Sequence, residues 1–206
     1  MVRLPKVDKF SKTFRVFRKN YKSIPLETLG NNPYKVLISV LLSSRTLDTT
    51  TLKAARRLFE KAPDIKKLKT LSTNQIRKLI YPVGFYRNKA RQLKSLAGMI
   101  IKEFAGRIPE AREELIKLPG VGRKTANLVL NRAFAKPAIA VDTHVHKISN
   151  MLGWVRTKTP EETEKVLGRI LPKKYWSGVN RLFVSIGQNH RGKKISEFLK
   201  KSKLTN

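Results

Sequence analysis

The residues best suited to chemistry in this 206-residue chain lie in one segment, LPGVGRKTANLVLNRAF, at positions 118–134. Gly120, Val121 and Gly122 form a tight turn between two predicted helices, and such a turn exposes main-chain N–H groups. Those groups, with the positive end of the following helix, suit a phosphate group. Glycine is needed because a side chain would keep a bulky anion away from the main chain.

The helix predicted after this turn, residues 123–134, begins with Arg123, Lys124 and Thr125. Its apolar stripe comprises Ala126, Val129, Leu130, Ala133 and Phe134, and Lys124 lies almost opposite that stripe. Lys124 is therefore either an exposed phosphate contact or part of a partly covered site, and Leu128, one turn further on, favours the covered site. The turn and its helices form a helix-hairpin-helix, a sequence-independent grip on the nucleic acid backbone that is common in nonenzymatic proteins.

A carboxylate follows the hairpin in the segment AIAVDTHVHKISN, residues 138–150. Ala138 to Val141 form an apolar approach to a helix that we predict to begin at Asp142 and to extend to Leu152. On local sequence alone, Asp142 is an N-cap. A capping role and a catalytic role are compatible for the same carboxylate.

The elements that must position these residues are helices joined by short connections, so we predict an all-α protein. Asn32 and Asp48 are the expected caps of two early helices, through Ser43 and Leu58, and Ser72 caps a third that ends before Tyr81. Thr159 begins a capping box. The other predicted helices cover 86–104, 110–117, 175–187 and a short basic stretch at the end of the chain, and a first helix buries the stripe of Phe10, Phe14 and Phe17.

The composition indicates a polyanionic partner. Lys and Arg number 45 against 14 Asp and Glu, a net charge of +31 that opposes compaction by self-repulsion. The chain contains no cysteine, which excludes disulfides, thiolate metal sites, iron–sulfur clusters and cysteine nucleophiles. We expect no membrane segment, because the longest apolar stretch, about 36–42, is far short of the roughly 20 residues required.

These residues together resemble the endonuclease III family of DNA glycosylases, within the helix-hairpin-helix superfamily that has a Gly/Pro-rich loop and an aspartate. The resemblance rests on LPGVGRKTAN followed by AIAVDTHVHKISN, and it extends upstream to PYKVLISVLLSSRTLD and VGFYRNKA. It covers about residues 25–190. It implies two helical domains flanking a DNA-binding cleft, namely a barrel with the hairpin at 27–136 and a second domain from both chain ends, 1–26 and 137–206.

The resemblance also implies a mechanism. The damaged base is flipped out of the duplex, and Lys124 is the nucleophile that attacks the sugar C1′. An amine attacks only when neutral, a form that the helix N-terminus, the neighbouring Arg123 and partial desolvation all favour. Base displacement leaves a Schiff base, and β-elimination then cuts the strand 3′ of the abasic site. Asp142 resembles the family's essential carboxylate, which stabilises positive charge at the sugar and assists proton transfer.

Other DNA contacts expected from the resemblance are Gly120, Val121, Gly122, Arg123, Thr125, Arg45, Phe85 and His144. Arg45 stands where the family typically has a glutamine that fills the space left by the flipped base. Phe85 stands where a leucine-type wedge separates the opposite bases. Without the resemblance, Phe85 would be a core residue and Arg45 a surface phosphate contact. Both departures leave substrate choice and opposite-base preference open.

Cofactor expectations follow from the same comparison. Many family members end in a four-cysteine loop around a [4Fe–4S] cluster, and the tail here, NHRGKKISEFLKKSKLTN, cannot form one. We expect Ile195, Phe198 and Leu199 to pack the tail helix in its place, and its lysines to face DNA. No metal site is expected from His144, His146 and His190. A monovalent cation at the hairpin carbonyls near Leu118 and Val121 is compatible with the resemblance.

The function expected is a bifunctional glycosylase and abasic-site lyase that removes damaged pyrimidines from duplex DNA. Two alternatives remain at this point. One is a monofunctional uracil or thymine mismatch glycosylase, and the other is a nonenzymatic helix-hairpin-helix DNA-binding protein. The expected partner is double-stranded DNA carrying a damaged base or abasic site. The protein is expected to be a monomer inside a prokaryotic cell, with an archaeal source favoured.

Overall fold

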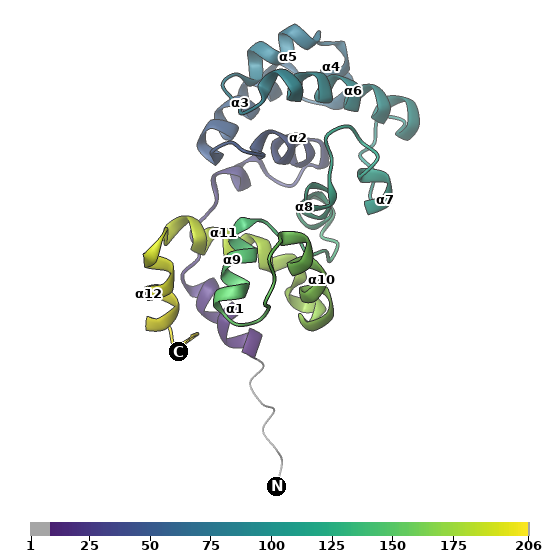
Figure 1. Cartoon of the computed structure of the whole chain (residues 1–206). Helices are drawn as coiled ribbons and strands as arrows, with labels where there is room; N and C mark the ends of the chain where they lie inside the picture. The colour runs from purple at the N-terminus through teal and green to yellow at the C-terminus, as the bar shows by residue number, and fades with distance from the viewer. Residues whose placement is uncertain (1–8, 206) are drawn as a thin grey trace. The chain divides into compact units, whose positions relative to one another are not determined.

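A computed structural model of the chain describes residues 9–205, and within that range it holds twelve α-helices, two short 3-10 helices and no strand. The all-α prediction is confirmed. The chain divides into two compact units, residues 25–138 and a unit made from 1–24 with 139–206 (Figure 1). No helix in the described range is long and apolar enough to cross a membrane.

The unit of residues 25–138 is arranged around α2 (Pro33–Ser43), which is buried along nearly its whole length. Asn32 caps this helix and Pro33 occupies its first turn, as expected from the sequence. Helix α2 packs against α3 (Asp48–Lys61), α6 (Tyr86–Phe104) and α8 (Arg123–Phe134). The 3-10 helix η1 (Pro25–Leu29) contacts α2 and α3.

Within this unit, α6 packs against α4 (Ile65–Thr70) and α5 (Thr73–Ile80), and the three helices are labelled at the top of Figure 1. Ser72 caps α5 through a capping box with Gln75, as expected. Helix α4 was not predicted from the sequence, although Asp64 caps it by accepting a hydrogen bond from the N–H of Lys67 at 2.8 Å. A six-residue helix carries too little periodic pattern to be detected.

Several expected helix boundaries were wrong. Asp48 does not cap α3; it is the first helical residue, and Leu47 occupies the N-cap position. The helix also continues past Leu58 to Lys61. The helix predicted at 110–117 is only α7 (Arg112–Leu115), since turns occupy the rest of that segment before the hairpin.

The second unit is held by an aromatic core. Phe10, Phe14 and Phe17 of α1 (Lys9–Lys19) are buried, which confirms the predicted stripe. Phe14 stacks on Tyr175 with ring centroids 4.3 Å apart, and Phe17 meets Phe183 edge-on at 5.0 Å. Phe183 belongs to α11 (Trp176–Asn189), which packs against α1 and α9 (Thr143–Met151).

Helix α10 (Pro160–Ile170) packs against α9, and the 3-10 helix η2 (Lys173–Tyr175) precedes α11. Thr159 caps α10 by accepting from the N–H of Glu162 at 3.1 Å, which is one half of the predicted capping box. The other half differs, because the Glu162 carboxylate accepts the N–H of Lys158 at 2.8 Å instead of that of Thr159. The Thr159 cap and the proline that follows fix where the helix begins.

The C-terminal helix α12 (Lys193–Lys201) packs through its apolar side, as predicted. Leu199 is fully buried, and Ile195 and Phe198 lie against the same core. The Phe198 ring stacks on His190 at 4.2 Å and lies 6.2 Å from Phe17. The short tail is therefore anchored by apolar and ring-stacking contacts.

Candidate active site and DNA-binding surface

The hairpin between α7 and α8 forms the tight turn predicted from its glycines. Gly120 adopts φ +82°, in the left-handed region, and a Cβ there would lie 3.0 Å from the side chain of Gln92. Gly122 is different. It has φ −95° and no described atom lies within 4 Å of the position a Cβ would take. The protein's own packing therefore does not require glycine at position 122.

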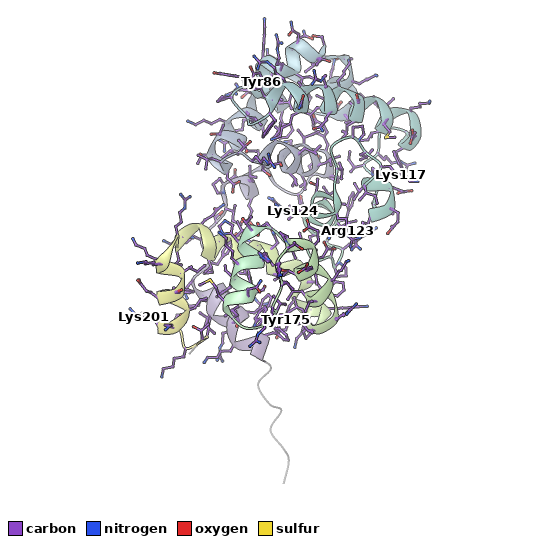
Figure 2. All side chains as sticks on the ribbon, viewed as in Figure 1. Tyr86, Lys117, Arg123, Lys124, Tyr175 and Lys201 are labelled. Atoms are coloured by element: carbon purple, nitrogen blue, oxygen red, sulfur yellow. The ribbon has the colours of Figure 1, made fainter. Side chains whose placement is uncertain are left out.

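Lys124 lies in the first turn of α8, where the N–H groups of a helix lack intrahelical partners and the helix end is positive (Figure 2). Its side chain and that of Arg123 are exposed. The opposite side of the helix is buried at Ala126 and Val129. Leu130 of the predicted stripe is buried as well, whereas Ala133 and Phe134 are only partly buried. Lys124 is exposed, although Leu128, one turn further on, is buried.

Asp142 occupies the N-cap of α9, as predicted from local sequence. Its Oδ1 accepts hydrogen bonds from the N–H groups of His144 and Val145, both at 2.9 Å. Both bonds use one oxygen, so Oδ2 carries the remaining acceptor capacity of the carboxylate. The residue is partly exposed. Lys124 and Asp142 belong to different units of the chain.

His144 lies half-buried in the first turn of α9. Its imidazole is packed directly on Gly187 of α11, and a Cβ at position 187 would overlap the ring. His146, two residues later, has a separate role: its Nδ1 is 2.7 Å from the Thr163 hydroxyl. Among the described residues, no group of three acidic, histidine or cysteine side chains could hold a metal ion.

An open pocket of about 310 Å³ within the 25–138 unit gathers four of the predicted DNA-binding residues. Its lining comprises Leu41, Ser44, Arg45, Phe85, Asn88, Lys89, Gln92, Gly120 and Thr125. Arg45 and Phe85, the residues at the predicted base-flipping positions, therefore lie beside the hairpin residues Gly120 and Thr125. They come from loops 40 positions apart in sequence.

Arg45 and Phe85 form a stacked pair at this pocket. The guanidinium carbon of Arg45 lies 5.4 Å from the centroid of the Phe85 ring, within cation–π range. Phe85 is 58% exposed, so the alternative that it is a core residue is wrong. Both residues have positive φ, 53° for Arg45 and 57° for Phe85, which is uncommon for side chains of this size.

Sequence reasoning missed Lys89, a buried lysine in the first turn of α6 that is only 7% exposed. Burial lowers the pKa of Lys89 to about 8. A signal was available, because Lys89 shares the buried face of α6 with Ala90, Leu93, Leu96, Ala97 and Ile100. A lysine on an apolar helical stripe is a conflict between residue type and position, and such conflicts often mark functional sites.

Comparison with known proteins identifies the family. Residues 38–173 match the model of the HhH-GPD superfamily base excision DNA repair proteins. The endonuclease III of Thermotoga maritima is 46% identical over 171 residues, which are 83% of this chain and 80% of that protein. The Bacillus subtilis endonuclease III is 39% identical over 165 residues, 80% of this chain and 75% of the relative.

A solved structure of a trapped endonuclease III–DNA covalent intermediate is similar in fold as well. Its TM-score is 0.79, with 36% sequence identity over 90% of this chain and 88% of that one. The hairpin, the capping aspartate, the all-α fold and these relatives all indicate the same family. The chain is a member of the endonuclease III family of DNA glycosylases and abasic-site lyases.

Proposed function

We propose that Lys124 and Asp142 carry the glycosylase and lyase reactions of this endonuclease III on damaged pyrimidines in double-stranded DNA. The observation that carries this assignment is the exposed amine of Lys124 on the first turn of α8, directly after the hairpin. The relative trapped as a covalent intermediate with DNA supports a nucleophile on the protein.

The reaction begins when the neutral amine of Lys124 attacks C1′ of the damaged nucleotide. The C1′–N bond breaks, and the base leaves with the bonding electrons and takes up a proton. The amine nitrogen loses a proton, the C1′–O4′ bond breaks with O4′ taking up a proton, and the nitrogen and C1′ form a protonated Schiff base. Loss of a C2′ proton expels the 3′ phosphate by β-elimination, and water releases the lysine from the imine.

Asp142 stabilises the positive charge that develops at the sugar and assists proton transfer. Two main-chain N–H groups hold its Oδ1, so the carboxylate is oriented by α9 itself. The remaining oxygen is the one assigned to the reaction. The capping bonds and the catalytic role therefore use different atoms of the same side chain.

The hairpin holds the sugar-phosphate backbone through Gly120, Val121, Gly122, Arg123 and Thr125. The open space around Gly122 supports this role, because a phosphate can approach the main chain there. Arg45 enters the space that the extruded base leaves, and Phe85 is the wedge that separates the opposite bases. Their exposure beside the pocket suits stacking on DNA bases. His144 completes the DNA contacts from the second unit.

A monovalent cation at the main-chain carbonyls of Leu118 and Val121 is part of the same proposal. Main-chain carbonyls are suitable donors for such an ion. The Leu118 carbonyl already accepts the N–H of Val121 at 3.0 Å, which leaves one lone pair. The ion would stiffen the hairpin and supply positive charge near a phosphate. Replacing K⁺ by tetramethylammonium would then weaken DNA binding at constant ionic strength.

The decisive experiment is borohydride trapping on duplex DNA containing an abasic site or thymine glycol. Wild type, Lys124→Ala and Asp142→Asn are compared. We expect a covalent adduct in wild type, none with Lys124→Ala, and slow formation with Asp142→Asn while DNA binding is retained. Base release that survives Lys124→Ala, without strand cutting, would instead establish a monofunctional glycosylase. Tight binding without either reaction would leave only a binding protein.

A further inference from the structure

Lys89 connects the two loops that carry Arg45 and Phe85. Its Nζ donates to the carbonyl oxygens of Leu42 at 2.8 Å and Ser44 at 2.6 Å, and it lies 3.5 Å from the Thr46 hydroxyl. An ammonium group has three N–H donors, and these three acceptors match them. All three acceptors lie at or just after the C-terminal end of α2, whose last carbonyls lack intrahelical partners.

The same hydroxyl of Thr46 reaches the second loop. It accepts the N–H of Gly84 at 3.0 Å, while donating to the Ser44 carbonyl at 3.2 Å. The loops are in direct contact there, since a Cβ at Gly84 would lie 2.5 Å from the Arg45 carbonyl oxygen. We call the set of Lys89, Thr46 and Gly84 the loop tie.

Arg45 and Phe85 need the loop tie, because their contact with each other is too weak to hold both side chains in place. A cation–π contact between exposed side chains is weak, because water competes with it. Arg45 and Phe85 also have positive φ angles, and side chains other than glycine keep such angles only when their surroundings hold them. Each of these residues lies next to a member of the loop tie: Arg45 precedes Thr46, and Phe85 follows Gly84.

A buried ammonium is a costly way to fill this position. Lys89 shares its helical face with apolar residues, and burying a charge is unfavourable even where hydrogen bonds compensate it. A methionine of similar length would fill the same space without that cost. What only the lysine supplies is the set of three donors to the loop that carries Arg45.

We propose that Lys89 is a positioning residue for base extrusion, which holds Arg45 and Phe85 as one preorganised pair through the loop tie. This inference rests on the proposed function, in which Arg45 fills the space vacated by the flipped base and Phe85 separates the opposite bases. It differs from a plain capping role for α2, because its effect falls on extrusion of a base and not on reaction at a sugar that has no base.

The test separates these two steps. Single-turnover release of thymine glycol from a duplex requires extrusion, whereas strand cutting at a preformed abasic site has no base to extrude. We expect Lys89→Met to slow base release about 10- to 100-fold and abasic-site cutting by less than about threefold, since misplacing a positioning group by about 1 Å costs rates of this order. Equal loss in both assays, or no loss in either, would overturn the proposal.

Thr46→Val provides a second variant should Lys89→Met fold poorly. It removes the hydroxyl from a partly exposed site and should reproduce the defect in base release, whereas Thr46→Ser should retain wild-type rates. The double variant Lys89→Met with Thr46→Val should be no slower than Lys89→Met alone, because both changes break one connection. Additive losses, or a Thr46→Val enzyme that behaves as wild type, would contradict the loop tie.

Lys94→Met is the matched control. Lys94 lies on the same helix and also donates to main-chain carbonyls, those of Lys69 and Leu71, away from the pocket. It should leave both rates unchanged. A 2-aminopurine beside the lesion reports unstacking whether or not any bond is cut, so it tests Lys89 even if the trapping experiment disproves the Lys124 chemistry. Equal fluorescence in wild type and Lys89→Met would overturn the role of Lys89.

Discussion

At the scale of single residues, the two hairpin glycines have different reasons to be glycine. Gly120 has a positive φ and a close neighbour, Gln92, so the fold itself requires it. Gly122 has ordinary backbone angles and open space around it. Stability and DNA binding should therefore respond differently to substitution at these two positions.

Gly122→Ala tests this difference. We expect its free energy of unfolding to stay within about 1 kcal/mol of wild type, because reduced unfolded-state entropy and a poorer N-cap oppose each other. Its affinity for duplex DNA should nevertheless fall, since the methyl group obstructs the phosphate. Gly120→Ala should lose stability as well. Urea unfolding and DNA titration measure the two effects, and unchanged DNA affinity in Gly122→Ala would contradict the assigned phosphate contact.

Lys89 predicts a pH dependence of stability. Its pKa is about 8 in the folded protein and about 10.5 when unfolded. Below pH 8 both states carry the proton and the cost of burying the charge is complete. Between pH 8 and 10.5 the unfolded state binds more protons, so the stability of wild type rises with pH relative to that of Lys89→Met. Arg45 is the other cation that lines the pocket.

The measurement is urea unfolding of wild type and Lys89→Met at several pH values in that range. The difference between the two proteins isolates Lys89 from the many exposed lysines, which titrate in both. Parallel stability profiles would show that Lys89 has the same proton affinity in the folded and unfolded chain.

At the scale of elements, the contact between α9 and α11 sets the position of Asp142. The imidazole of His144 lies directly on Gly187, so the two helices approach each other at a position where α11 has no side chain. Asp142 caps α9 two residues before that contact. A change in the α9–α11 spacing therefore moves the carboxylate.

Gly187→Ala should destabilise the protein by about 1–3 kcal/mol through overpacking, despite the higher helix propensity of alanine. It should also slow base release, because the displaced α9 carries Asp142. Adding His144→Ala removes the ring and should restore stability relative to Gly187→Ala. Thermal unfolding of the single and double variants provides the check, and a Gly187→Ala protein as stable as wild type would rule out the close contact.

At the scale of the whole molecule, a net charge of +31 favours binding to a polyanion and opposes folding. Helix α12 separates these two effects. Its Leu199 anchors it in the core, while Lys193, Lys194, Lys200 and Lys201 are exposed. The apolar and basic sides of this helix can therefore be altered independently.

Replacing those four lysines of α12 by glutamine should retain the fold and weaken DNA binding. The slope of log K against log salt should become shallower by about 0.9 for every phosphate that the variant no longer neutralises. Leu199→Ala is the complementary variant, expected to cost about 2–5 kcal/mol of stability. Measuring DNA affinity as a function of salt concentration tests whether the lysines of α12 contact DNA. If the slope of the four-lysine variant equals that of wild type, α12 does not face DNA.

The sequence by itself determined the helical class, most helix starts, the buried stripe of α1 and the apolar anchoring of α12. These depend on local caps and on periodic apolar positions, which a single segment carries. It also singled out Lys124 with its glycine turn and Asp142 as an N-cap. The short helix α4 and the start of α3 at Asp48 escaped because their local signals are weak or ambiguous.

Only the tertiary structure decided which distant residues meet. The contact of Arg45 with Phe85 and the bonds of the buried Lys89 to the end of α2 join residues that are 40 to 47 positions apart. Local sequence carries no record of such contacts, because they depend on how α2 and α6 pack. Likewise, no local sequence feature predicted that the ring of His144 packs on Gly187. Position 187 requires glycine because the ring of His144 occupies the space that a side chain would need.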